Sequence, residues 1–428
     1  MAGGLMQLVA YGAQDVYLTG NPKVTFFQAV YKRHTNFAME NIEQTVNGTA
    51  ANSGRVSVTI ARNGDLVGDM YVELQSAAAK TSTADNDNSS NFDCNWVAER
   101  AIASAELSIG GQRIDKHYQR WWRLYSELYL DEAKKANWAK MTTAITGKTV
   151  YLPLIFFFNR NPGLYLPLIA LQYHEVRIDF DLSDKFDKYL STTVFKVWAN
   201  YVYLDTEERR RFAQKGHEYL IEQVQHTGSD TVTASGTAQN KRLSYNHPVK
   251  ELVCCFNDPA SGNAATSLWN FTAAPAAGDI ILESNVRAVS ESNCFVPTTF
   301  ASGVPLVYVG DAGSTRDFTE ESVGPLSTFK LVLNGQDRFK EQKGKYFNQV
   351  QAYNHHTGCP YPGVYSYSFA LKPEEHQPTG TCNFSRIDNA QVAVTLPSLC
   401  PATTMHMFAV NYNVLRIQSG MGGLSFSN

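Results

Sequence analysis

Leu107–Arg113 reads LSIGGQR, and Leu331–Arg338 in the second half of the chain reads LVLNGQDR. Each stretch is a short strand-like run that ends at a pair of turn residues, Gly110-Gly111 or Asn334-Gly335. The pair is one of five landmarks that run in the same order through both halves of the sequence. Gene duplication of a β-domain is the simplest cause of such an ordered repeat.

The other four landmarks share short motifs, the clearest of which is Ile-Glu-Gln at Ile42 and again at Ile221. The offset between copies increases after the second landmark, which indicates an insertion between Asn257 and Pro325. That insertion is rich in small and polar residues and is expected to form surface loops. The remaining pairs are Asn36–Val46 with Glu218–Val224, Arg55–Val67 with Arg242–Val253, Tyr151–Leu182 with Val364–Leu396, and Trp198–Leu204 with Ala409–Leu415.

The repeat and its strand pattern predict an all-β chain of two tandem eight-stranded antiparallel jelly-roll sandwiches, with one or more short helices in loops. A length of 428 residues also exceeds what one hydrophobic core usually serves. The predicted boundaries are an N-terminal arm at residues 1–24, a first jelly roll at 25–206, a charged linker at 207–216 and a second jelly roll at 217–428. The linker carries Glu207, Glu208 and three arginines, which predicts a solvated, self-neutralising connector.

The main predicted helix spans Tyr118–Met141, where tryptophans, tyrosines and leucines recur at helical spacing. The simplest interpretation is an amphipathic helix that covers the end of a sheet, and the alternative is a contact between subunits. The N-terminal arm is too apolar for a disordered tail and too short for a domain, so it is expected to pack on this fold or on a neighbour. Its apolar residues are Leu5, Leu8, Val9, Tyr11, Val16 and Tyr17.

The seven cysteines have scattered spacings and no Cys-x-x-Cys pair, which predicts reduced thiols and a reducing compartment. Cys254 and Cys255 are expected to point to opposite faces of one strand. The net charge of −3, with no large basic block, argues against direct contact with nucleic acid. No apolar run reaches the ~20 residues of a membrane helix, and the start of the chain lacks the features of a secretory signal.

The sequence offers no catalytic residue, cofactor site or metal site, and therefore predicts a protein that is not an enzyme. His355 and His356 are adjacent, so on a strand they would face opposite ways, unlike the His-x-His pair of a cupin metal site. Asp179 and Asp181 could share a face of a strand, but carboxylates at that spacing are usually structural or solvent-facing. The metalloprotease, phosphate-loop and nucleophile-elbow motifs are all absent.

Four Asn-x-Ser/Thr sequons occur, at Asn47, Asn88, Asn270 and Asn383. Such triplets arise freely by chance, and a chain without a secretory signal would not meet the lumenal glycosylation machinery. Asn88 and Asn270 are the possible glycosylation sites because both lie in predicted outer loops.

The chain resembles the major capsid proteins of nucleocytoplasmic large DNA viruses, of the type found in algal viruses. The resemblance covers nearly the whole chain and is weakest in the loops at Ser76–Asn91 and Asn257–Pro325. The stretches that carry it are Met1–Leu5 with Gln7–Asp15, Gly110–Tyr118, Pro153–Asn159, Asn334–Phe339, Gly380–Ala390, and Asn411–Ile417 through Gly420–Leu424.

The resemblance implies two consecutive jelly rolls per chain and a homotrimeric capsomer whose six similar domains make a pseudo-hexagonal tile. Such tiles form the icosahedral shell of a large double-stranded DNA virus, over an inner membrane in which the protein is not inserted. Assembly in the host cytoplasm, contacts with neighbouring capsomers, and glycans on outward loops in some members are also implied. The N-terminal arm resembles the segment that meets minor capsid proteins on the inner side.

Alternate loops of a jelly roll lie at one end, and one set is expected to face outward. From the landmark order, the expected outward loops include Asn47–Gly54, Asn159–Gly163, Ser183–Thr193 and Lys372–Gly380. Two other functions use the same fold: a carbohydrate-binding module and a jelly-roll enzyme. A glycan array would separate the first from a shell protein, and the missing ligand or nucleophile set weakens the second.

Overall fold

The structure, a computed structural model, describes residues 3–77, 96–144, 146–233, 236–257, 325–360, 363–396 and 403–426. It also describes the short pieces 268–269, 271, 281–282, 287–289, 295–296 and 308–309. The chain divides into two compact units, Met1–Asn36 and Phe37–Asn428. Most of the predicted loops Ser76–Asn91 and Asn257–Pro325 lies outside the described residues.

The first unit contains two short helices, α1 (Gly3–Val9) and α2 (Val16–Thr19). Asp15 holds the turn between them, because its side chain accepts a hydrogen bond from the Gly12 amide at 2.8 Å. The apolar side chains of this unit are exposed, from 49% for Val16 to 99% for Phe27. The unit therefore has the composition of a docking segment without a core of its own.

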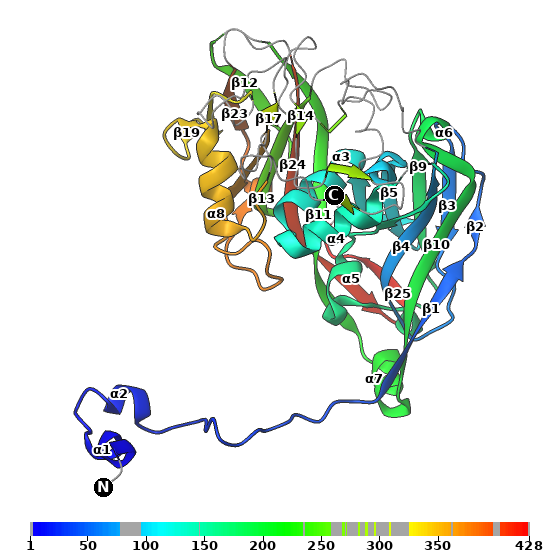
Figure 1. The fold of residues 1–428 in the computed structure, drawn as a ribbon. Helices are drawn as coiled ribbons and strands as arrows, with labels where there is room; N and C mark the ends of the chain where they lie inside the picture. The colour runs from blue at the N-terminus through cyan, green and yellow to red at the C-terminus, as the bar shows by residue number, and fades with distance from the viewer. Residues whose placement is uncertain are drawn as a thin grey trace. The chain divides into compact units, whose positions relative to one another are not determined.

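The first jelly roll consists of two antiparallel sheets (Figure 1). One sheet has the order β1-β10-β4-β7 with β8 beside β4, and the other has the order β2-β3-β9-β5-β6. The strands are β1 (Phe37–Gln44), β2 (Val46–Asn47), β3 (Arg55–Thr59), β4 (Leu66–Ser76), β5 (Ile102–Ile109), β6 (Gln112–Tyr118), β7 (Thr149–Pro153), β8 (Leu166–Pro167), β9 (Val176–Leu182) and β10 (Leu190–Leu204).

The second jelly roll repeats this plan with the orders β11-β24-β13-β21 and β12-β23-β18-β19. Short strands β20, β22 and β25 pair beside these paths, and β14–β17 form two isolated two-stranded pieces. The strands are β11 (His217–Val232), β12 (Gln239–Leu243), β13 (Pro248–Asn257), β14 (Ile281–Leu282), β15 (Arg287–Val289), β16 (Phe295–Val296), β17 (Tyr308–Val309), β18 (Thr328–Leu333), β19 (Gln336–Asp337), β20 (Gln342–Lys343), β21 (Val364–Ser368), β22 (Cys382–Asn383), β23 (Ala390–Thr395), β24 (Thr403–Gln418) and β25 (Met421–Leu424).

The five sequence landmarks fall on corresponding strands of the two jelly rolls, which confirms the predicted duplication. The hairpin landmark turns at Gly110 and Gly111 in one copy and at Asn334 and Gly335 in the other, with φ between 50° and 82° at all four positions. Two consecutive positive φ angles are the signature of the tight hairpin turn that matches strand twist, and Gly and Asn adopt them most readily.

The strands correspond, but one register does not. Asn200 in β10 lies opposite Asn41, whereas its counterpart Asn411 in β24 lies opposite Gln223. The Ile-Glu-Gln alignment pairs Asn41 with Leu220, three residues before Gln223. The pairing of β11 with β24 is therefore shifted by three residues relative to the pairing of β1 with β10. The shared motifs therefore identify equivalent strands without giving equivalent residue pairs.

The predicted helix at Tyr118–Met141 is two helices, α3 (Gln119–Leu128) and α4 (Glu132–Thr142), while Tyr118 still belongs to β6. The break has a local cause: the Asp131 side chain caps α4 by accepting a hydrogen bond from the Lys134 amide at 2.7 Å. Further helices are α5 (Phe157–Arg160), α6 (Phe186–Tyr189), α7 (Thr206–Gln214) and α8 (Gln351–His355), the last preceded by a π-helical turn at Tyr346–Val350. The charged segment between the jelly rolls is thus helical, and Arg209 pairs with Asp65 at 3.0 Å.

The loops Asn159–Gly163 and Lys372–Gly380 were expected to lie at the same end of their sandwiches as the other outward loops, but they lie at the opposite end. Asn47–Gly54 and Ser183–Thr193 do share an end, because the Ser53 amide donates to the Ser183 carbonyl at 3.0 Å. Asn159–Gly163 follows β7. Its Asn159 side-chain amide donates to the Gly68 carbonyl at 2.8 Å, near the start of β4 and therefore at the other end of the sandwich. Lys372–Gly380 follows β21, the corresponding strand of the second copy, so the same correction applies. The landmark order did not resolve how many strands precede each loop, and one strand more or less moves a loop to the other end.

The core consists of two apolar clusters that meet at the sheet β11-β24-β13-β21. Cys254 belongs to the cluster inside the second jelly roll, and Cys255 to the cluster that continues into the first. The two thiols therefore point to opposite faces of β13, as predicted. The four cysteines Cys254, Cys255, Cys359 and Cys382, the only ones within the described residues, are free thiols.

Candidate functional site

The most extensive built site is the joint between the two jelly rolls, which we define as the contact of α3, α4, α5 and β6 with the sheet β11-β24-β13-β21. Figure 1 shows α3 and α4 between the strands of the two sandwiches. In β13 every residue from Val249 to Asn257 is buried. Because successive side chains of a strand point to opposite faces, both faces of this sheet are covered.

Aromatic packing forms the apolar part of the joint. Trp121 of α3 is 2% exposed and lies against Phe408 of β24, with 5.6 Å between ring centroids. Tyr118 meets His226 of β11 at 4.9 Å. Val253 and Phe408 of the second jelly roll belong to the same apolar cluster as the core of the first. The two sandwiches are therefore joined by a continuous core.

A buried charge cluster around Glu222 crosses the joint. Arg160, the last residue of α5, lies 3.0 Å from the Glu222 carboxylate, and Lys250 of β13 lies 2.5 Å from it. Burial alone would raise the pKa of Glu222, but these two cations outweigh it and lower that pKa. The carboxylate is therefore ionised and neutralises a cation from each jelly roll.

A second cluster surrounds Glu251 of β13, whose two side-chain partners follow α3 and α8. Tyr129, which follows α3, donates its hydroxyl to Glu251 at 2.5 Å, and the His356 ring also bonds Glu251. The other His356 nitrogen lies 3.2 Å from Glu374. Burial alone would lower the pKa of His356, but the charge of Glu251 and the bonds to both carboxylates raise it to about 9. His356 is therefore a buried imidazolium at neutral pH.

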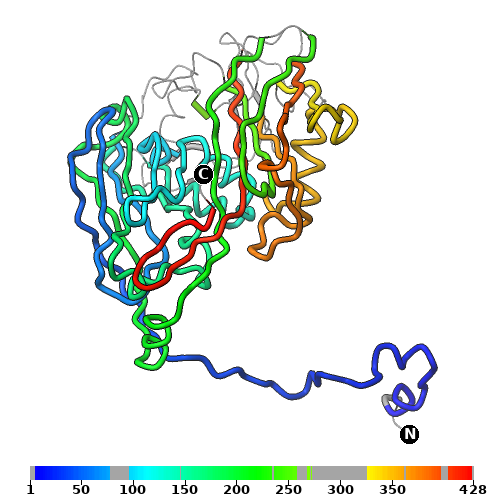
Figure 2. The backbone as a smooth tube through the Cα atoms, turned by 180° about the vertical axis from the view of Figure 1, so that it is seen from behind, coloured from blue at the N-terminus to red at the C-terminus, as the bar shows by residue number. Residues whose placement is uncertain are grey.

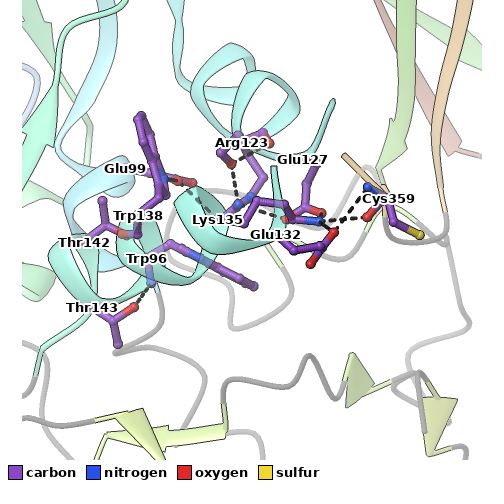
Figure 3. A network of polar contacts seen from close by, with 11 residues as sticks. Trp96, Glu99, Arg123, Glu127, Glu132, Lys135, Trp138, Thr142, Thr143 and Cys359 are labelled. Atoms are coloured by element: carbon purple, nitrogen blue, oxygen red, sulfur yellow. Dashed lines mark hydrogen bonds and ion pairs between the residues drawn. The ribbon is translucent and has the colours of Figure 1, made fainter. Parts of the chain in front are cut away.

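A chain of alternating charges runs along α3 and α4 toward the second jelly roll (Figure 3). Arg123 lies 3.3 Å from Glu99 and 2.9 Å from Glu127, and Lys135 lies 3.0 Å from Glu127. Lys135 then donates to the Cys359 carbonyl of the second jelly roll at 2.7 Å. Burial raises the pKa of Glu99 to about 7, against the opposing charge of Arg123. This series of charges thus connects Glu99, a buried acid of the first jelly roll, to the backbone of the second.

Close backbone approach supplements these charges. A Cβ at Gly358 would lie 2.5 Å from the Glu127 carbonyl, so only glycine allows this loop to reach the end of α3. At the far end of the joint, the Leu424 amide of β25 donates to Gln112 at 3.1 Å, and the Tyr173 amide donates to Gly420 at 3.0 Å. Gln112 belongs to the hairpin landmark, so the turn that identifies the fold also contacts the second copy.

The predicted candidate residues have structural roles where the structure describes them. His355 ends α8 and His356 follows it, so the strand geometry considered for the pair does not apply; His355 bonds the Leu371 carbonyl at 3.0 Å. Asp179 and Asp181 do share a face of β9, and both pair with Arg55, at 3.2 and 3.7 Å. Asn88 and Asn270 lie outside the described residues.

Among the residues that the structure describes, no group of three or more His, Cys, Asp or Glu side chains could hold a metal ion. Within the same part of the chain, no helix is long and apolar enough to cross a membrane. The arrangement at the joint is suited to holding two sandwiches in a fixed relation. Sequence reasoning missed Glu222, Arg160 and Glu251 as joint residues; the one available signal was the repeated Ile-Glu-Gln motif, which contains Glu222 and its counterpart Glu43.

Comparison with known proteins identifies the family. Residues 25–205 match the family model for the major capsid protein N-terminus, and residues 208–423 match that for the large eukaryotic DNA virus major capsid protein. The major capsid protein of Paramecium bursaria Chlorella virus 1 is 44% identical, over 100% of both chains. The chain belongs to this capsid protein family.

Solved structures agree with the family assignment. A chain in the quasi-atomic model of the PBCV-1 virus capsid is 40% identical with a TM-score of 0.74, and the match covers 94% of this chain and 100% of that one. The Faustovirus major capsid protein, 13% identical, matches with a TM-score of 0.67 over 97% of this chain and 96% of that one, which shows the fold alone. The protein is thus a double jelly-roll major capsid protein of a large DNA virus, and a component of the virion capsid.

Proposed function

We propose that the protein self-assembles as a homotrimeric capsomer with a pseudo-hexagonal outline, and that these capsomers tile the icosahedral shell. The observation that carries the proposal is the joint, which packs two sandwiches of the same topology into one compact unit with a shared apolar cluster. Three such chains present six similar domains, and closed cyclic symmetry is the usual arrangement of homo-oligomers. A tile of this outline meets its neighbours through quasi-equivalent edges.

We further propose that the domain boundaries follow the sequence repeat, with an arm at residues 1–24, jelly rolls at 25–206 and 217–428, and a linker at 207–216. The two family matches, at residues 25–205 and 208–423, support this division. The exposed apolar residues of the arm support a role in assembly, in which Leu5, Leu8, Val9, Tyr11, Val16 and Tyr17 bind minor capsid proteins on the inner side of the shell.

The remaining elements of the proposal concern the surroundings of the capsomer. Assembly takes place in the host cytoplasm, next to an inner membrane into which the protein does not insert. The net charge of −3 supports a shell that does not bind the genome directly. Asn88 and Asn270 are the proposed sites for any glycan on the outer loops, and the role is structural rather than enzymatic.

Sedimentation equilibrium of the purified full-length chain tests the trimer. The expected result is one stable species of three chain masses over a wide concentration range. A strict monomer at high concentration would contradict the proposal. Treatment of intact particles with a protease then tests the arm, which should be protected in particles and cleaved in free trimers.

A further inference from the structure

The two jelly rolls differ in the coverage of one equivalent surface. In the second copy, the outward face of the sheet β11-β24-β13-β21 is covered by α3 and its neighbours. In the first copy, the described residues cover the equivalent face of β1-β10-β4-β7 only in part: alternate β4 residues from Asp69 to Gln75 are exposed or half-buried, while those between them are buried. We call this open surface the first-copy face.

The first-copy face carries aromatic and charged side chains in register. Trp198 of β10 lies between Glu43 of β1 and Tyr71 of β4, and Lys196 lies opposite Glu73. Tyr71 and Tyr151 contact edge to face at 5.6 Å, and the Trp198 indole donates to Glu73 at 2.7 Å. Tyr151 is 37% exposed. Large aromatic side chains are enriched at the centre of protein interfaces, and polar side chains surround them at the rim.

The element that would fit this face is present on the same chain. The helical turn at Tyr346–Val350 and α8 lie between β19 and β21, the same place in the strand order that α3 has between β6 and β7. Phe347 and Ala352 are buried against their own jelly roll, whereas Val350 and Tyr353 are 42% and 88% exposed. In Figures 1 and 2, α8 lies on the flank of the second jelly roll away from the first. The chain cannot fold this helix onto its own first-copy face.

We propose that the first-copy face binds the helical segment Tyr346–His355 of a second copy of this chain. The contact between chains would resemble the joint within the chain. In the joint, α3 of the first jelly roll, which precedes β7, covers the outer face of the second. Between chains, the segment Tyr346–His355 of the second jelly roll, which precedes β21, would cover the outer face of the first jelly roll of the next chain. Such a head-to-tail contact closes into a ring when the rotation allows. The proposal rests on the trimer proposed above and assigns the surface that forms it.

The acid on each face strengthens the correspondence. Glu222 in β11 lies on the covered face and binds cations from both copies, and Glu43 is its counterpart in the Ile-Glu-Gln repeat. Glu43 lies on the open face opposite Trp198. Because of the three-residue register shift, the two acids do not occupy equivalent positions, but each sheet carries a carboxylate of the motif on this face: Glu222 binds cations within the chain, and Glu43 is exposed.

Substitutions that introduce a negative charge on each side test the contact in the full-length chain. Y353E or V350E on the helix, and Y151E on the first-copy face, should each weaken trimer association by at least roughly tenfold, the effect of removing an interface hot spot. The control is N240E, because Asn240 is exposed in β12, the edge strand of the other sheet of the second jelly roll, and belongs neither to the joint nor to the first-copy face. Its trimer should be unchanged. Thermal unfolding of each variant confirms that the monomer is folded.

The outcomes separate the two proposals. A wild-type trimer that dissociates with Y353E, V350E and Y151E but not with N240E supports the assignment. A wild-type trimer that survives all three substitutions overturns the assignment and leaves the trimer intact. If a helix variant fails to fold, an interchain disulfide replaces it: Y353C with Y151C, in a C359S background, should join chains on oxidation. Absence of that cross-link in a stable trimer also overturns the assignment, and a monomeric wild type overturns both proposals.

Discussion

The outer faces of β13 and β4 show how two copies of one sheet came to differ. Both strands are central in sheets of the same order. β13 is buried from Val249 to Asn257, whereas β4 alternates between buried and half-buried residues from Met70 to Ser76. Each sequence agrees with the burial of its strand. In β13, ELVCCFN is nearly continuous in apolar residues, whereas in β4, MYVELQS alternates between inward apolar and outward residues. Duplication preserved the strand order, and the side chains then adapted to a partner within the chain or to none.

The largest expected difference between the covered and the open face is between removal of the buried Glu222 and removal of the exposed Glu43. E222A leaves Arg160 and Lys250 buried without a counter-charge, and should lower the free energy of unfolding by about 3–5 kcal/mol. E43A removes an exposed carboxylate, and should change it by less than about 0.5 kcal/mol. Urea unfolding at two protein concentrations separates folding from association. Equal losses in the two variants would show that the covered and open faces are not different in kind.

The sequence alone predicted much of this fold because its strongest signals are local. The turn residues at Gly110 and Asn334 mark the same hairpin in both copies, and the order of the landmarks reproduces the order of the strands. The helix at Tyr118–Met141 was only half right, since periodicity continued across the break that Asp131 caps. The loop ends were partly wrong because the strands between Tyr151 and Leu182 could not be counted from landmarks.

The joint could not be predicted, because it depends on contacts between residues far apart in the chain. Arg160 and Glu222, or Tyr129 and Glu251, have no shared motif that would pair them. His356 was considered with His355 as a possible strand pair, and its bonds to Glu251 and Glu374 arise only when α8 is placed beside β13. Burial of charge is a tertiary property, and no periodicity in the sequence reports it.

The pH dependence of stability should distinguish the covered face through His356. Its pKa is raised to about 9 by Glu251 and Glu374 in spite of burial, above an unfolded value near 6.5. The stabilisation is therefore fully present below pH ~6.5 and is lost as pH rises through about 9, with a size on the order of 3 kcal/mol. Other groups also titrate at high pH, so the measurement is the difference between wild type and H356Q. That difference should shrink steadily across the range, and a difference independent of pH would contradict a buried imidazolium.

The smallest expected effect comes from comparing Tyr129, which follows α3, with Tyr353 of α8. Tyr129 donates its hydroxyl to the buried Glu251 at 2.5 Å, so Y129F removes a hydrogen bond to a charged group and should cost about 2 kcal/mol. Tyr353 is 88% exposed, and Y353F keeps its ring while removing a hydroxyl that faces water in the free chain. Its free energy of unfolding should stay within about 0.5 kcal/mol of wild type. Both substitutions delete one oxygen, so urea unfolding compares the two helical segments directly. If Y353F were as costly as Y129F, the hydroxyl of Tyr353 would already have a buried partner within its own chain, and the first-copy face would lose its proposed occupant.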